Sequence, residues 1–206
     1  MEHVLDYAAL IDRILCEVDA DAYLAYADAV DPTQQQAMSE IEAAMKQPGF
    51  MPSQVSSLVH SLHASGRIDR VHKLSALHVI AASPAVADYN EAAQLAAQQE
   101  QAAIELGGPR LQANLASVER HRGVLAFVQE RYEIALDYFS RAFERQHSAG
   151  NLSNVLATLL RLGDITEARD LLTQVRSNLP SPLVTDLERI IAADPDLALL
   201  RTEARP

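Results

Sequence analysis

Four of the seven histidines lie within the stretch HSLHASGRIDRVHKLSALH, which begins at His60. His60 and His63 are three residues apart and would lie on the same face of a helix. Imidazole binds zinc, and His72, His78 or Asp69 could supply the remaining ligands of a tetrahedral site. The six-residue spacing of His72 and His78 points them in different directions, however, and the sequence has neither an HExxH motif nor a cysteine pair. We therefore interpret the histidines as surface and packing residues and expect no bound metal; a metal-dependent enzyme is the less favoured alternative.

The same stretch holds a basic patch formed by Arg67, Arg70 and Lys73. The patch could bind a phosphate or contact the acidic N-terminal part of the chain, and we favour the second. Residues 1–50 carry ten acidic side chains against two basic ones, which gives −8 of the formal net charge of −11. Because binding to a nucleic-acid backbone needs a basic surface, we expect no nucleic-acid partner.

Other catalytic motifs are missing from the sequence. Gly107-Gly108 is not followed by the Lys and Ser or Thr of a phosphate-binding loop, and no GxSxG motif occurs. The single Cys16 has apolar neighbours, so we interpret it as a buried hydrophobe. We therefore predict no enzymatic activity and no cofactor. One cysteine cannot form an internal disulfide, and neither a secretory leader nor a membrane-spanning apolar run is evident, so we expect a cytoplasmic protein without a membrane partner.

The elements that position these residues are predicted to be helices. Ala and Leu dominate the apolar residues, and no stretch alternates apolar and polar residues as a strand would. Cap-plus-proline pairs such as Asp31-Pro32 and glycine breaks such as Gly107-Gly108 mark helix ends. These signals predict helices over 2–18, 20–30, 32–47, 53–65, 69–82, 85–106, 110–129, 132–148, 151–162, 164–178 and 182–193. The predicted fold class is all-α, with short links that make consecutive helices antiparallel neighbours.

Small residues recur at fixed spacings in the stretch RGVLAFVQERYEIALDYFSRAFERQ, which begins at Arg122. Gly123 lies twelve residues before Ala135, which is followed by Phe139 at +4 and Ala142 at +7. Similar spacings recur 33 residues later and, less completely, once upstream. Those positions are Leu156, Ala168, Leu172 and Val175, and Ile80, Ala92 and Ala96. The spacing indicates repeated helix pairs that approach closely where the side chains are small.

This pattern resembles the tetratricopeptide repeat, a helix-turn-helix unit of about 34 residues, over about residues 69–180. In style it is similar to the repeats of bacterial regulators and adaptors of this family. The resemblance implies an α-α superhelix of stacked hairpins, with residues 182–193 as the terminal capping helix. We thus expect an acidic N-terminal helical region at 1–50 and a repeat region with its cap at 51–206, with a soft boundary within 47–53.

The tetratricopeptide family binds peptides or partner helices on the inner face of the stack, which the first helix of each hairpin lines. The resemblance implies a partner-binding groove made of Leu77, Ser117, Arg120, Val124, Phe127, Ser153, Ala157 and Leu160. Such a surface is mostly apolar with one cation, which suits an amphipathic helix or a hydrophobic peptide. Val124 stands where the family's carboxylate clamp would need Asn, so that clamp is not expected. The alternative that these side chains are inter-helix core stays open, above all for Phe127 and Leu160.

These expectations favour a protein–protein interaction module, an adaptor or scaffold, whose partner is another protein or a peptide. A second hypothesis is a regulatory sensor domain that binds a signalling peptide and changes the curvature of the stack. Self-association into a homodimer stays open as well.

Overall fold

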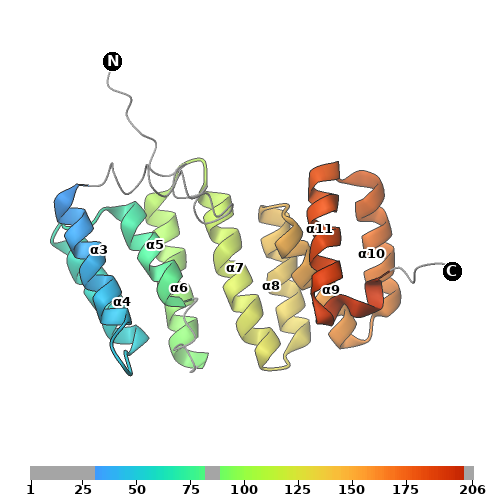
Figure 1. The fold of residues 1–206 in the computed structure, drawn as a ribbon, viewed down its shortest axis with the longest axis horizontal. Helices are drawn as coiled ribbons and strands as arrows, with labels where there is room; N and C mark the ends of the chain where they lie inside the picture. Colours follow the sequence, from blue (N-terminus) through green and yellow to red (C-terminus); the bar gives the residue numbers. More distant parts are fainter. Residues whose placement is uncertain (1–30, 82–88, 202–206) are drawn as a thin grey trace, which may run out of the picture. The chain divides into compact units, whose positions relative to one another are not determined.

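The computed structural model describes residues 31–81 and 89–201, and every regular element within them is a helix (Figure 1). The predicted all-α fold class is thereby confirmed for this part of the chain. The chain forms two compact units, unit 1 up to Leu111 and unit 2 from Gln112, which are described separately. The predicted helices 2–18 and 20–30 lie outside the described residues, as does Cys16.

The described part of unit 1 consists of two helix pairs. The pairs are α3 (Pro32–Met45) with α4 (Pro52–Ala64), and α5 (Arg70–Ala81) with α6 (Tyr89–Leu106). The cap-plus-proline signal at the start of α3 is confirmed, because the Thr33 N–H donates to Asp31 Oδ1 at 2.7 Å and Pro32 opens the helix. The hydrogen bond from the Thr33 backbone also lowers the pKa of Asp31.

Helix α5 lies at the centre of unit 1 and packs against α3, α4 and α6. The buried side chains of these helices form one hydrophobic cluster. Its members are Ala37, Ile41, Val55, Val59, Leu62, Ile68, Ala76, Leu77, Ile80, Leu95 and Ala102. Helix α3 contributes Ala37 and Ile41 to this cluster, so it shares a core with the helices that follow it.

Two polar contacts show that α4 and α6 run parallel. The backbone N–H of Ser53 donates to Glu91 Oε1 at 3.0 Å, and His60 Nε2 contacts Gln98 Oε1 at 3.2 Å. Each contact joins residues 38 apart, and in both helices the contacts are about two turns from each other. The second helices of the two pairs therefore have the same direction, as repeated hairpins require.

The described part of unit 2 consists of five α-helices and a short 3₁₀ helix. They are α7 (Leu111–Val128), α8 (Tyr132–Arg145), α9 (Ala149–Leu162), α10 (Ile165–Asn178), α11 (Ser181–Ala193) and η1 (Pro195–Leu200). The five α-helices confirm the sequence prediction, with ends that agree within three residues. The 3₁₀ helix was not predicted.

Helices α7 and α8 pack closely at Gly123. A Cβ atom added to Gly123 would lie 2.5 Å from the Phe139 ring, so only glycine leaves room for this ring. Ala135 and Ala142 on α8 are fully buried. These contacts confirm that the small residue at position 123 lets the first helix of the pair lie against the second.

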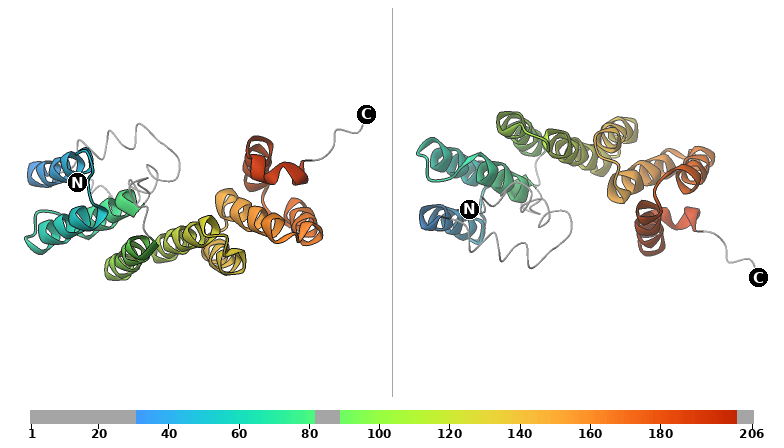
Figure 2. Two further views of the ribbon diagram at one scale, coloured as in Figure 1. Left: turned by 90° about the horizontal axis from the view of Figure 1, so that it is seen from below. Right: turned by 90° about the horizontal axis from the view of Figure 1, so that it is seen from above.

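Helix α9 lies at the centre of unit 2 and packs against α8, α10, α11 and η1 (Figure 2). It begins at Ser148, whose Oγ accepts a hydrogen bond from the Asn151 N–H, and ends at Gly163 with a φ of 89°. The cluster around it comprises Ala126, Ala135, Phe139, Leu152, Val155, Leu156, Leu159, Ala168, Leu172, Val175, Leu187, Ile191, Leu197 and Leu200.

The 3₁₀ helix η1 covers the end of this cluster. Leu197 and Leu200 are buried, and the Arg201 guanidinium donates to the backbone oxygens of Ile191 and Asp194. Helix α11, predicted at 182–193, and η1 therefore both cover the last apolar side chains of unit 2.

Candidate partner-binding surface

Helix α7 exposes an apolar stripe beside the face that contacts α8. Gly123 faces α8, whereas Val124 and Val128, one helical turn apart, are 44% and 69% exposed. Arg120 precedes Val124 by one turn, and its Nη2 donates to Ser117 Oγ at 3.3 Å. The structure thus brings the predicted groove residues of α7 to one face of the helix.

The ring of Phe127 joins this stripe to α9. Phe127 is half-buried against the unit 2 cluster and meets Tyr132 edge-on, with ring centroids 5.3 Å apart. On its other side the guanidinium carbon of Arg161 lies 5.9 Å from the ring centroid, within the range of a cation–π contact. Phe127 therefore packs at the edge of the hydrophobic core and also contacts the Arg161 guanidinium.

Helix α9 contributes a second stripe that ends at Arg161. Asn154 and Ala157 precede Arg161 by about two turns and one turn, and both are half-buried. Arg161 Nη2 donates to Asp196 Oδ1 of η1 at 2.7 Å, and the two side chains are 48% and 42% exposed. The guanidinium is thus held in place by Phe127 and Asp196 while about half of it stays in water.

The two stripes together form what we call the α7–α9 surface. It consists of Ser117, Arg120, Val124, Phe127, Val128, Asn154, Ala157 and Arg161. None of these residues is acidic, although the chain carries 28 acidic residues and a net charge of −11. The surface therefore combines exposed apolar side chains with two cations in a chain of opposite net charge.

Three of the predicted groove residues lie elsewhere. Leu77 is fully buried in the core of unit 1 and is not available to a partner. Ser153 is 7% exposed, and its Oγ donates to the Gly150 backbone oxygen. Leu160 is half-buried and packs against the unit 2 cluster. Burial favours the interpretation as inter-helix core for Leu77 and Ser153, whereas Leu160 is half-buried, as Ala157 is.

Sequence reasoning missed Val128, Asn154 and Arg161. The outer side chains of α9 on this surface are those at 154, 157 and 161, whereas the predicted set was 153, 157 and 160. Asn154 lies three residues before Ala157 and Arg161 lies four residues after it. These two polar side chains indicate which face of α9 is exposed.

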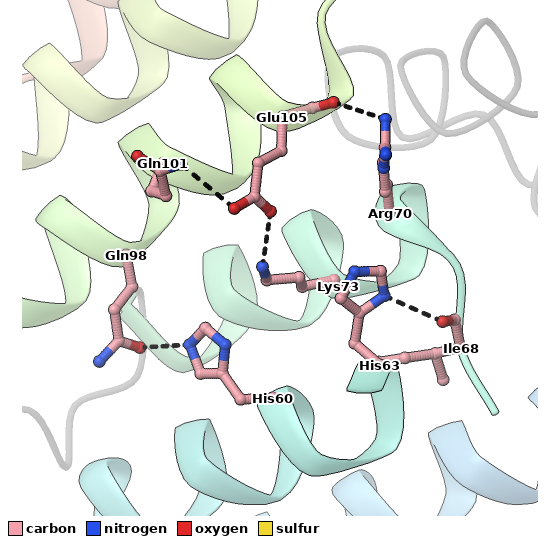
Figure 3. Close-up of polar contacts among 8 residues, drawn as sticks. All are labelled: His60, His63, Ile68, Arg70, Lys73, Gln98, Gln101 and Glu105. Atoms are coloured by element: carbon pink, nitrogen blue, oxygen red, sulfur yellow. Dashed lines mark hydrogen bonds and ion pairs between the residues drawn. The ribbon is translucent and has the colours of Figure 1, made fainter. Parts of the chain in front are cut away.

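The clustered histidines of unit 1 make structural contacts (Figure 3). His60 Nε2 contacts Gln98 Oε1, and His63 Nδ1 donates to the Ile68 backbone oxygen at 3.1 Å. His72 is fully buried, and its Nδ1 lies 2.7 Å from Asp69 Oδ1. Among the described residues no group of three or more His, Cys, Asp or Glu side chains is placed to hold a metal ion.

The basic patch is occupied by carboxylates and carbonyls. Arg67 donates to both oxygens of Glu40, at 3.0 and 2.6 Å, and so contacts the acidic N-terminal region as predicted. Lys73 Nζ donates to Glu105 Oε2 at 2.8 Å, and Arg70 donates to the Glu105 backbone oxygen (Figure 3). The hydrogen bonds from Arg67 and Lys73 lower the pKa values of Glu40 and Glu105.

The contact between Asp69 and His72 predicts an acid-sensitive step in stability. Burial raises the pKa of Asp69, but hydrogen bonds from the His72 ring and backbone N–H outweigh it and leave the pKa below 3.8. A carboxyl whose pKa is lower in the folded than in the unfolded chain stabilises the fold above the unfolded pKa. That stability is lost as the pH falls through the lower, folded value.

We therefore expect Asp69→Asn to lower the free energy of unfolding at pH 7 by about 0.5 kcal/mol, a small effect because the carboxyl is partly in water. The variant should lose less stability than the wild type when the pH falls below about 4. Urea unfolding followed by circular dichroism at pH 7, 4 and 3 measures both effects. Asp170→Asn, at an exposed position on α10, is the control; equal pH dependence of Asp69→Asn and the wild type would contradict the assignment.

Comparison with known proteins assigns neither a family nor a function to the chain. No family model, curated protein or solved structure matches the chain. Within the described residues no helix is long and apolar enough to cross a membrane. The contacts, exposure and charge of the α7–α9 surface are therefore the grounds on which its function is proposed.

Proposed function

We propose that this chain is a tetratricopeptide-like helical-repeat protein that binds another protein, laying a partner helix or apolar peptide on the α7–α9 surface. The observation that carries the proposal is the pair of exposed valines, Val124 and Val128, beside the Phe127 ring that supports Arg161. The single cysteine suits a reducing compartment such as the cytoplasm, where an adaptor of this kind would act.

The packing of unit 2 supports the repeat assignment. Gly123 and Phe139 touch across one helix pair, and Ala135 and Ala168, 33 residues apart, are both fully buried in the second helix of their pairs. A stack of such pairs leaves one face of each first helix without a neighbour in the same chain. On α7 that face carries the two exposed valines.

The composition of the surface suits an interaction site. Single exposed apolar residues are common on any protein, but two valines one turn apart beside a phenylalanine form a continuous apolar strip. Fully burying one such side chain contributes about 1.5–3 kcal/mol, so covering this strip could supply several kcal/mol of binding free energy. Aromatic residues and arginine are also the side chains that most often dominate binding energy at interfaces.

We expect the double variant Val124→Asp, Val128→Asp to weaken partner binding by at least about tenfold, because each carboxylate would have to be desolvated against an apolar partner. Both side chains point to solvent, so the helical content should not change. The measurement is capture from native lysate with immobilised wild type and variant, quantified by mass spectrometry, with circular dichroism of each protein.

The matched control is Ile134→Asp, at an exposed apolar position on α8 outside the α7–α9 surface. A protein retained by the wild type and by this control, but lost by the double variant, is the expected result. The same set of proteins on all three baits would exclude the surface as the binding site.

A further inference from the structure

We propose that Arg161 selects partners that present a carboxylate next to their apolar face, and that Asp196 holds the Arg161 guanidinium until the partner's carboxylate replaces it. This inference rests on the proposed function. It adds the chemical class of the partner: an amphipathic segment with two large apolar side chains one helical turn apart and an Asp or Glu one turn beyond them.

The guanidinium of Arg161 is both ordered and accessible. Its carbon lies over the Phe127 ring at 5.9 Å and its Nη2 is bonded to Asp196 Oδ1 at 2.7 Å, while about half of the side chain is in water. A guanidinium carries five N–H donors in a planar fork, and a bidentate carboxylate is its best partner. Among the described residues the guanidinium donates to Asp196, which leaves donors for a second carboxylate beside Asp196 or in its place.

Charge complementarity argues for an acidic partner. The α7–α9 surface contains Arg120 and Arg161 and no acidic residue, in a chain with a net charge of −11. Of the contacts to Arg161, the Asp196 carboxylate is the anionic one. A partner's carboxylate would therefore meet attraction at Arg120 and Arg161. Residues 1–50, which carry −8 of the net charge, would repel it.

The spacing of the side chains defines where that carboxylate lies. Val124 and Val128 are one turn apart, so a partner helix covers both with two side chains at i and i+4. Phe127 adjoins Val128 in the chain, and Arg161 lies over Phe127, so the cation lies at the Val128 end of the strip. The matching carboxylate belongs about one further turn along the partner.

Replacing Asp196 by Asn removes the negative charge and should leave η1 intact. Its backbone N–H donates to Asp194 Oδ1 at 2.9 Å, and this cap of the 3₁₀ helix does not involve the Asp196 side chain. Asp196→Asn therefore frees the guanidinium, and Arg161→Gln removes it. If a partner's carboxylate competes with Asp196, these two variants must change binding in opposite directions.

The test uses three fluorescein-labelled Ala-rich helical peptides with two leucines one turn apart, which differ only in Glu, Gln or Lys one turn beyond. Fluorescence anisotropy with the full chain gives the dissociation constants. We expect the Glu peptide to bind the wild type about threefold more tightly than the Gln peptide, as an exposed ion pair allows, and the Lys peptide to bind most weakly. The preference for Glu should vanish in Arg161→Gln and grow about twofold in Asp196→Asn.

The matched control is Arg176→Gln, which removes an ion pair with Glu188 that is also 2.7 Å long and similarly exposed but lies on α10 and α11. It should keep the wild-type preference. Equal binding of the Glu and Gln peptides, with both lost in the double valine variant, would overturn the role of Arg161 and leave the proposed function standing. If no peptide distinguishes the wild type from the double valine variant, both proposals fail.

Discussion

We expect Gly123→Ala to lower the free energy of unfolding by about 2 kcal/mol, because α7 and α8 approach each other closely at this residue. Alanine is the better helix former by about 1 kcal/mol, so an unhindered site would gain stability instead. Here the added Cβ would lie 2.5 Å from Phe139 Cε1 and 2.6 Å from its Cδ1. Phe139 is 2% exposed and packed on all sides, so the ring cannot move without opening the core, and overpacking of this kind costs about 1–3 kcal/mol or more.

Gly150→Ala is the control for this prediction, because a Cβ on Gly150, also within a helix, meets nothing within 4 Å. It should raise the free energy of unfolding by up to about 1 kcal/mol. Adding Phe139→Leu to Gly123→Ala makes room for the new methyl group and should recover part of the loss. Urea unfolding at pH 7 compares the four proteins. A Gly123→Ala variant as stable as the wild type would mean that α7 and α8 do not depend on this contact.

Helix existence and helix ends were the most predictable features of the fold. Their signals are local: Asp31 and Pro32 cap α3, and Gly163 ends α9 because its φ of 89° is one that other residues rarely adopt. The 3₁₀ helix η1 was missed although Asp194-Pro195 repeats the cap-plus-proline signal of Asp31-Pro32. Its six residues are too few to show a helical periodicity. What holds η1 in place is the burial of Leu197 and Leu200 against distant helices.

The helix pair of α3 and α4 could not be recognised as a repeat from sequence. Its core holds Ile41, Val55, Val59 and Leu62 beside Ala37, and these residues do not repeat the spacing of Gly123, Ala135 and Ala142. The constant 38-residue offset of the contacts between α4 and α6 shows that these two helices run parallel, which the sequence alone does not show.

The candidate site was predictable on α7 and only partly on α9. Val124 and Phe127 fall on the predicted face because Gly123 fixes which side of α7 is buried. On α9 the predicted set 153, 157 and 160 matches 120, 124 and 127 at the 33-residue offset, but Ser153 is buried there, whereas Arg120 is half-buried. Arg161 could not be found from spacing alone, because its partners Phe127 and Asp196 come from other elements.

The pair of α9 and α10 has Leu156 at the position where the pair of α7 and α8 has Gly123, and this difference in side-chain volume needs an explanation. We infer that the larger Leu156 on α9 is offset by a smaller side chain on α10. Phe139 opposite Gly123 is matched sixteen residues after Leu156 by the smaller Leu172, and both leucines are fully or almost fully buried in the unit 2 cluster. We infer that the two pairs fill similar spaces and divide them differently between the facing side chains.

We therefore expect Leu156→Ala alone to cost about 3 kcal/mol, because a fully buried leucine leaves a cavity, and Leu172→Phe alone to cost about 1–3 kcal/mol through overpacking. The double variant, Leu156→Ala with Leu172→Phe, imitates the division at Gly123 and Phe139, so it should be more stable than the sum of the single effects by about 1–2 kcal/mol. Urea unfolding of the wild type and the three variants completes the cycle. Strict additivity would mean that these positions do not share a space, and the correspondence between the two helix pairs would then lose its physical basis.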